Sequence, residues 1–413
     1  MSNNSSFMEE MKKTHTVLIP NMAPVQFSLI QAALESEGYH CVMLGKESRR
    51  AVELGLRYVH NDTCYPAILV IGQFLEALES GGYDRNHTAL LITQTGGGCR
   101  ASNYYRLLKK AMAKAGYEDI PVISANPSGL EEDSLPLTMK LLEKVVAGIW
   151  YGDEIFALRN QIKPYEIRQG ETEELVNKWI ETASGWIRRG KNIYPGMIKR
   201  SFRKIASDFA KIERNTDEKI KVGVVGEIFV KFSPLGNNDL MSFLENEGCE
   251  VNLPGLMGFV EYCIANYSID VSLYGGSRYV AAGADILLDL FDNIGRSMSE
   301  TLRSFGFYAP CSFHELMKKP EGIIHLGTKM GEGWLLSAEM AELIEGGYAN
   351  IICAQPFGCL PNHIAGKGVI NRLREKYPDA NITPVDYDTS ASKVNQENRI
   401  KLMLAVAEEN LHH

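Results

Sequence analysis

This 413-residue sequence lacks several features, and each absence excludes a class of protein. No apolar run approaches the ~18–20 residues that span a bilayer, so we expect no membrane-spanning helix. The polar start, residues 1–15, lacks the apolar stretch of a signal peptide, and this favours a cytoplasmic location. Basic residues number 43 against 51 acidic ones, and the resulting net charge of −8 argues against a dedicated nucleic-acid binder.

Cysteine is also scarce, because eight residues in a chain of this length are too few for a disulfide scaffold. The absence of a C-x2-C pair weakens an ordinary zinc-ribbon interpretation. No G-x-x-x-x-G-K-[ST] string is present either. The glycine-rich segment 327–333 has a different residue order, and we expect its Glu332 and Gly333 to open a helix. The chain therefore does not look like an ATPase.

Short apolar runs alternate with helical patterns in both halves of the sequence. This alternation predicts parallel strands with helices on both faces, and functional loops at the carboxyl ends of the strands. We expect strands at residues 15–19, 40–44, 88–93, 120–124, 219–229, 322–326, 349–354 and 381–385. We expect helices at residues 25–37, 67–78, 103–115 and 392–408.

Residues 136–212 carry no strand signal. Apolar residues such as Trp179, Ala183 and Trp186 recur there at steps of three and four, which indicates an amphipathic helix. The fold class is therefore α/β, with two Rossmann- or flavodoxin-like lobes that have parallel sheets, a helical segment that joins them, and a cleft between them. The expected boundaries are a disordered tail at 1–14, a first lobe at 15–135, a helical connector at 136–218 and a second lobe at 219–410.

Three cysteines occupy similar places beyond expected strands. Cys64 precedes Pro66 and an apolar helical stretch, so we expect it at a helix start, where the dipole favours thiolate over thiol. Cys99 follows a glycine run behind the strand at 88–93, and glycine lets a backbone approach a ligand closely. Cys359 lies in another strand-to-helix turn. The positions suggest a shared metal site, with packing thiols as the alternative, and thiolates suit zinc or an iron–sulfur cluster.

The remaining cysteines fit packing roles better. Cys41 and Cys353 fall inside expected strands, while Cys249 and Cys263 lie in helix-like or strand-edge settings. Cys311 stands at an expected helix start and is a reserve ligand. Cys353 is a second reserve, because it lies close in sequence to the third cysteine of the suggested site.

Several longer strings are specific enough to carry a family resemblance. They are residues 61–66, 93–104, 226–232 with 237–238, 355–368 and 386–402. These strings resemble proteins related to 2-hydroxyacyl-CoA dehydratase activases, found alone or as the carboxyl-terminal part of very large activase polypeptides. That group is similar to the subunits of 2-hydroxyacyl-CoA dehydratases and benzoyl-CoA reductases. The matches run from about residue 15 to residue 410.

The resemblance implies a [4Fe–4S] cluster in the cleft, held by Cys64, Cys99 and Cys359, with one iron left for substrate or a small ligand. It also implies an ATP-dependent, ASKHA-type activase as the donor of one low-potential electron. In such relatives the electron passes to an acyl-CoA thioester, and the ketyl radical that results allows loss of a β-hydrogen and a hydroxyl group. This chain would be the cluster-bearing partner, present as one subunit where the dehydratases use two.

Other polar residues are candidates for binding or catalysis. We expect Gly96, Gly97 and Gly98 to let their loop approach the cluster, with Arg100 as a charge partner for the cluster or an anionic substrate. Arg100 and the nearby Arg106 could equally pair with surface acids. Further sites remain open, and the candidates for a proton donor, base or hydrogen-bond donor are Glu227, His363 and Lys367, although the last two also suit an exposed helix face.

The sequence thus suggests an oxygen-sensitive iron–sulfur protein of anaerobic metabolism, a lyase or reductase acting on an acyl-CoA. One rival is a cluster-carrying electron-transfer or regulatory partner of the activase, without its own substrate. The other is a metal-free module that binds a small molecule. We expect no nucleic-acid or membrane partner, and a homodimer is compatible with the sequence.

Overall fold

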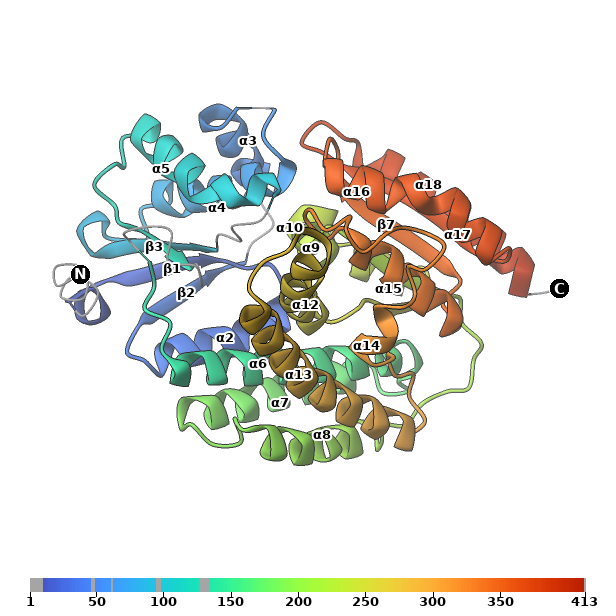
Figure 1. The fold of residues 1–413 in the computed structure, drawn as a ribbon. Coiled ribbons are helices and arrows are strands. Elements are labelled where there is room, and N and C mark those ends of the chain that lie inside the picture. Colours follow the sequence, from blue (N-terminus) through green and yellow to red (C-terminus); the bar gives the residue numbers. More distant parts are fainter. Residues whose placement is uncertain (1–9, 46–48, 61, 94–97, 126–133, 412–413) are drawn as a thin grey trace.

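The computed structural model describes residues 10–45, 49–60, 62–93, 98–125 and 134–411. It shows an α/β protein with two lobes above a layer of helices (Figure 1). In the described part of the chain, no helix is both long enough and apolar enough to cross a membrane.

The N-terminal lobe is built on four parallel strands. They are β1 (Thr16–Pro20), β2 (His40–Leu44), β3 (Thr88–Thr93) and β4 (Val122–Ala125). Their order in the sheet is β2-β1-β3-β4. The helices of this lobe are α2 (Pro24–Glu35), α3 (Arg49–Tyr58), α4 (Tyr65–Glu79) and α5 (Tyr104–Ala115). Helices α3 and α4 touch through their backbones, because a Cβ atom on Gly72 would lie only 1.8 Å from the carbonyl oxygen of Ala51.

A layer of helices lies below both sheets in Figure 1. Its members are α6 (Met139–Ile162), α7 (Glu171–Arg188) and α8 (Pro195–Phe209), which match the connector expected from the sequence. The apolar face that carries Trp179 and Ala183 is buried, as the helical spacing predicts. Tyr151 of α6 is fully buried and contacts the rings of Trp186 and Phe202 edge-on.

The C-terminal lobe repeats the sheet of the first lobe. Its strands are β5 (Lys221–Gly226), β6 (Glu250–Asn252), β7 (Asn350–Pro356) and β8 (Asn381–Tyr387), all parallel, in the order β6-β5-β7-β8. Its helices are α9 (Ile228–Phe232), α10 (Pro234–Asn237), α11 (Leu240–Asn246), α12 (Leu256–Tyr274), α13 (Arg278–Ser304), α14 (Phe313–Leu316), α15 (Trp334–Glu345), α16 (Leu360–Ala365), α17 (Ile370–Lys376) and α18 (Lys393–Leu411). The two lobes therefore share one topology, in which the first and third strands of each lobe are neighbours.

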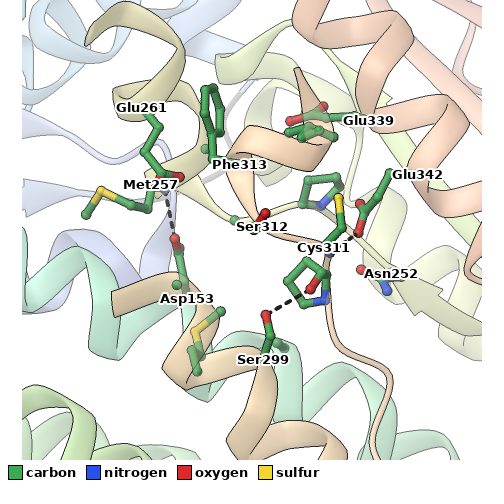
Figure 2. Close-up of a pocket in the computed structure, with 18 of the residues that line it drawn as sticks. Asp153, Asn252, Met257, Glu261, Ser299, Cys311, Ser312, Phe313, Glu339 and Glu342 are labelled. Atoms are coloured by element: carbon green, nitrogen blue, oxygen red, sulfur yellow. Dashed lines mark hydrogen bonds between the residues drawn. The ribbon is translucent and has the colours of Figure 1, made fainter. Parts of the chain in front are cut away.

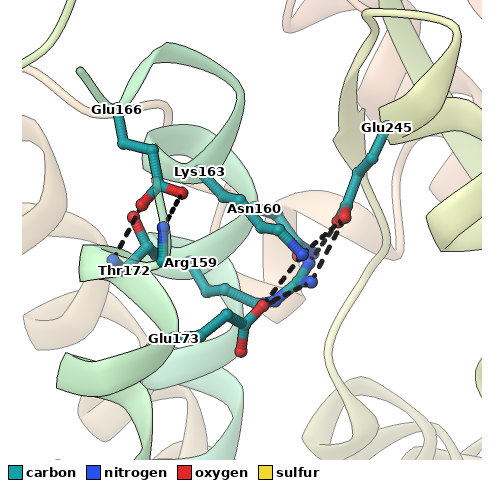
Figure 3. Close-up of polar contacts among 8 residues, drawn as sticks. Arg159, Asn160, Lys163, Glu166, Thr172, Glu173 and Glu245 are labelled. Carbon is teal, nitrogen blue, oxygen red and sulfur yellow. Dashed lines mark hydrogen bonds and ion pairs between the residues drawn. The ribbon is translucent and has the colours of Figure 1, made fainter. Parts of the chain in front are cut away.

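An ion-pair network joins the connector to the C-terminal lobe (Figure 3). Arg159 and Lys163, at the end of α6, both contact Glu173 of α7 at 2.7 and 3.0 Å. Both also contact Glu245 of α11, and the Lys163 Nζ–Glu245 Oε2 distance is 2.7 Å. Because the Arg159 and Glu245 side chains are each only 14% exposed, this network is screened less than a surface pair.

The structure corrects three sequence expectations. Residues 322–326 are not a strand: the sheet has only β6, β5, β7 and β8 among the described residues, and Ile323 is buried outside it, where its carbonyl accepts a hydrogen bond from the Arg372 side chain. The short edge strand β6 was not expected. Residues 10–14, placed in a disordered tail, are helical, and Met11 is only 1% exposed.

Candidate functional site

The two sheets present their functional loops at equivalent points. Cys99 follows β3, Glu227 follows β5 and Cys359 follows β7. In a parallel sheet of this type, the crevice between the first and third strands, beyond their carboxyl ends, is the usual ligand site. Both lobes therefore place chemistry-bearing residues at this point of the fold.

Each of the three suggested ligand cysteines stands directly before a helix. Cys64 is the N-cap of α4, Cys99 precedes a short 3-10 turn, and Cys359 is the N-cap of α16. Proline occupies the first turn of α4 and of α16, where its missing N–H group has no helical partner. Backbone N–H groups at the start of the following helix act on each sulfur, and they are those of Ala67 for Cys64, of Ala101 and Ser102 for Cys99, and of Asn362 for Cys359.

The three cysteines share one buried neighbour, the carboxyl group of Glu227, and two of them also share Glu332. Glu227 exerts an electrostatic effect on Cys64, Cys99 and Cys359, and Glu332 acts on the last two. Cys99 also acts on Cys64. The structure thus brings together residues from both lobes that are far apart in the sequence.

Gly331 shows how closely these segments approach. Its φ is +60°, and a Cβ atom there would lie 3.0 Å from Pro361 and 4.0 Å from the Cβ atom of Cys99. The glycine-rich segment before α15 therefore lies between the Cys99 segment and the first turn of α16. A side chain at this position would be strained by the backbone and crowded by both neighbours.

Hydrogen bonds hold two of the thiols in place. The Tyr104 hydroxyl lies 2.9 Å from Cys64 Sγ. The Asn362 side-chain amide donates to Cys359 Sγ at 3.4 Å and to Glu332 Oε2 at 3.1 Å. Among the described residues, Asn362 Oδ1 has no hydrogen-bond partner although it is buried. This oxygen is an unused acceptor directly beside the Cys359 thiol.

Burial makes the three thiols weak acids. It raises the pKa of Cys64 to about 11 and that of Cys359 to about 12, and it raises the pKa of Cys99 as well. The sequence suggested the opposite for Cys64, because a helix N-terminus favours thiolate. Loss of hydration outweighs the dipole here. Without a bound cation, all three are therefore thiols at neutral pH, and this excludes a free thiolate nucleophile.

The two carboxyl groups of the site are also poor acids. Burial, followed by repulsion from Glu332, raises the pKa of Glu227 to about 8. Burial likewise raises the pKa of Glu332. Glu227 Oε2 accepts the Val230 N–H, and Glu332 Oε1 accepts the Ile228 N–H, so both side chains are fixed. At neutral pH, Glu227 holds a proton beside the cysteines.

Three of the other candidate residues predicted from the sequence, Arg100, Lys367 and Arg106, have exposed side chains. Arg100 is exposed and donates to the backbone carbonyl of Asp62, so it links the loop before Cys64 to the Cys99 segment. Lys367 is exposed and forms an ion pair with Asp386 at 3.5 Å. Arg106 is exposed as well.

His363 and the glycine run complete the set of candidates. His363 packs its ring edge-on against Phe357, and its Nδ1 atom is buried without a partner among the described residues. Gly96 and Gly97 lie outside the described residues. Gly98 lies within them, and a Cβ atom there would lie 1.9 Å from Met330 Sδ, so Gly98 permits that close contact.

The reserve ligands lie elsewhere. Cys353 is fully buried in β7, and Cys311 lies beside Glu342, so neither belongs to the convergent set. Cys41 and Cys249 are buried packing residues, as expected. Cys263 is exposed on α12, so the packing interpretation is wrong for this residue.

Three neighbours of the cysteines were not identified from the sequence as site residues. They are Tyr104, Glu332 and Asn362. Asn362 could have been found from the sequence. It stands three residues after Cys359, and residues three apart at a helix start lie on the same face of the helix. As expected, Glu332 and Gly333 open α15.

The site has the donor types for a metal centre but not the spacing for a single ion. Within the described ranges, no three or more His, Cys, Asp or Glu side chains are grouped so that they could hold one metal ion. Ligands of a cubane cluster lie farther apart than ligands of a single ion, because each thiolate binds a different iron. Three thiols that come together from separate segments of the chain fit that donor set.

Comparison with known proteins does not place the chain in a family. No protein-family model matches it, and no curated protein matches it either.

Proposed function

We propose that this chain is an iron–sulfur protein of the 2-hydroxyacyl-CoA dehydratase superfamily, in which Cys64, Cys99 and Cys359 ligate a [4Fe–4S] cluster between the lobes. The observation that carries the proposal is the convergence of these three cysteines, each before a helix, on the carboxyl group of Glu227. Three thiolates leave one iron of a cubane without a protein thiolate. Bound there, the cluster would supply one-electron transfer at low potential.

The chain's own residues would position the ligands and manage protons. Tyr104 and Asn362 hold the Cys64 and Cys359 sulfurs through hydrogen bonds, and contacts of this kind orient ligands and tune a metal centre. Glu227, with a pKa of about 8, carries a proton on its carboxyl group at neutral pH. We assign it as the general acid that protonates a departing hydroxyl group of the substrate.

The proposed reaction is reduction or dehydration of an acyl-CoA, with an ASKHA-type, ATP-dependent activase as electron donor. Apolar side chains that are at least half exposed support a docking surface for such a donor beside the cysteines. They are Met330, Phe357, Leu360 and Ile364, which lie in the Gly331 and Cys359 segments. A cytoplasmic location and a homodimeric assembly belong to the same proposal.

The exposed apolar surface also favours a second candidate function. A protein that only relays electrons between an activase and another enzyme needs a docking surface but no acyl-CoA site. In that case the cluster-bearing chain would be an electron-transfer or regulatory partner.

One experiment separates these functions. The protein would first be reconstituted with iron and sulfide in the absence of oxygen. It would then be mixed with activase and ATP, and reduction of the cluster would be followed by the visible spectrum. A titration with a 2-hydroxyacyl-CoA would come last. Reduction together with thioester binding supports the enzyme. Reduction without thioester binding supports the electron carrier. A third outcome is protein that holds no iron, is not reduced and does not bind the thioester. This outcome supports a metal-free binding module and overturns the proposal.

A further inference from the structure

A cavity lies apart from the three suggested ligand cysteines, because none of them lines it (Figure 2). Its walls come from α6, α12, α13, α15 and the segment 310–316. The cavity volume is about 110 Å³. Since a water needs roughly 10–15 Å³ by the same measure, a molecule with several non-hydrogen atoms fits.

Carboxyl groups dominate the polar lining of this acidic cavity. All of them are less than a tenth exposed, and they come from four different helices. They are Asp153, Glu261, Asp292, Glu339 and Glu342. Five buried carboxyl groups around one space disfavour an anionic guest, because every one of them that is ionised would repel it.

Four of these carboxyl groups are already engaged by the protein. Asp153 accepts the Gln26 amide at 2.8 Å and the first backbone N–H groups of α12. Glu339 pairs with buried Lys231 at 3.0 Å.

The other two engaged groups hold the segment 310–316. Glu342 Oε1 accepts from the Tyr308 hydroxyl and the Cys311 N–H at 2.8 and 2.9 Å. Asp292 accepts the Phe313 N–H at 2.6 Å, and Arg296 Nε lies 3.0 Å from its other oxygen.

Glu261 is the exception. Its side chain is 6% exposed, and its Oε1 atom has no hydrogen-bond partner in the part of the chain that the structure describes. In Figure 2 it extends from α12 on the same side of the cavity as Asp153. Burial, then Asp292 and Asp153, raise the pKa of Glu261 well above its usual range. A cation placed here would relieve both the missing hydrogen bond and the repulsion.

The rest of the lining suits an organic cation better than a metal ion. Trp150, Met257, Met298 and Phe313 give an apolar and partly aromatic wall, against which an alkyl chain packs and an ammonium group is attracted. A hard metal ion needs several free oxygens, and within the described ranges no group of side chains suits one.

We propose that the acidic cavity binds a small aliphatic primary amine, whose ammonium group donates a hydrogen bond to Glu261. This site does not depend on the iron–sulfur proposal, because Cys64, Cys99 and Cys359 do not contribute to it.

Calorimetric titration of the full chain with butylamine tests the proposal, with 1-butanol as an uncharged probe of the same length. Butylamine should bind, and 1-butanol should bind at least tenfold more weakly. Glu261→Gln should weaken butylamine binding by tenfold or more. Glu154→Gln is the matched control, because Glu154 is fully buried with both oxygens unpartnered among the described residues, yet does not line the cavity. It should bind butylamine like the wild type.

A second variant keeps the proposal testable if Glu261→Gln does not fold. Gly258 lines the cavity, and a Cβ atom there would meet nothing within 4 Å, so Gly258→Leu should fill the space without removing a charge and abolish butylamine binding. Undiminished binding in either cavity variant would overturn the proposal. So would equal affinity for 1-butanol, or Glu261-dependent binding of Mn²⁺ without any binding of butylamine.

Discussion

The hydroxyl group of Tyr104 lies 2.9 Å from the sulfur of Cys64, and this contact ties together two segments of the N-terminal lobe. Tyr104 is the first residue of α5, directly behind the Cys99 segment. The hydrogen bond therefore fixes the start of α4 against the start of α5. It also lowers the pKa of Cys64 and so opposes part of the effect of burial.

Tyr104→Phe should make the Cys64 thiol harder to ionise. Because the lost hydrogen bond stabilises a charged group, we expect alkylation of Cys64 by iodoacetamide at pH 9 to slow by roughly tenfold in apoprotein. Mass spectrometry of the modified peptides gives the rate at each cysteine. Cys359 is the internal control, since its hydrogen bond comes from Asn362. An unchanged rate at Cys64 would show that the tyrosine does not act on the thiol.

Replacing any one suggested ligand cysteine by serine should lower iron content. We expect Cys64→Ser, Cys99→Ser and Cys359→Ser to lose most of their iron after anaerobic reconstitution, because two remaining thiolates hold a cluster poorly. Cys41→Ser is the control, since Cys41 is buried against the N-terminal sheet. Iron and labile sulfide would be measured for all four. Equal iron content in the four proteins would contradict the ligand assignment.

Most of the strands and helices could be predicted from the sequence, because each is marked by the spacing of apolar residues within its own segment. The expected strands at 40–44 and 88–93 coincide with β2 and β3, where apolar residues run continuously between turn signals. Residues 322–326 have the same apolar character, but the Ile323 carbonyl accepts a hydrogen bond from the distant Arg372 side chain and not from a neighbouring strand, and the sequence does not reveal such a contact. The sequence did not predict β6, because the charged residue Glu250 interrupts the apolar pattern of this strand. Glu250 is buried there by hydrogen bonds from Tyr165 and Tyr348, which come from distant segments.

The candidate site was predictable to the same extent. Cys99 and Cys359 could be found because each follows an expected strand, Glu227 because it lies near the end of one, and Cys64 because Pro66 and an apolar stretch mark a helix start. Glu332 could not, because it acts through Asn362 and Ile228, which lie on other segments. The raised thiol pKa values were also unpredictable, since they depend on how closely the lobes pack.

The buried Lys231–Glu339 pair should be costly to break from one side. Both side chains are 3% exposed, so Lys231→Met leaves an unpaired buried carboxyl group and should cost roughly 3–5 kcal/mol of unfolding free energy. The double variant Lys231→Met with Glu339→Leu should recover most of that loss. Urea denaturation of the three proteins measures both effects. A double variant no more stable than Lys231→Met would contradict this account of the pair.

The apoprotein should lose stability as the pH rises from 5.5 to 8. The pKa of Asp153 is raised to about 6 and that of Glu227 to about 8, so the folded state keeps protons that the unfolded chain has released. The free energy of unfolding therefore falls across this window, by on the order of 2 kcal/mol or more.

Urea denaturation at several pH values measures this trend. Glu154→Gln should show a smaller fall, because burial alone raises the pKa of Glu154. A free energy of unfolding that rises between pH 5.5 and 8 would show that these carboxyl groups do not titrate as the structure indicates.

The most direct test of the central proposal is the amount of iron and acid-labile sulfide per chain, with a visible spectrum, in protein purified without oxygen. We expect about four of each, as in a single cubane. About eight of each would require a second or larger cluster and ligands beyond the three convergent cysteines. No iron, even after reconstitution, would mean that the cysteine turns are structural and that the iron–sulfur proposal is wrong.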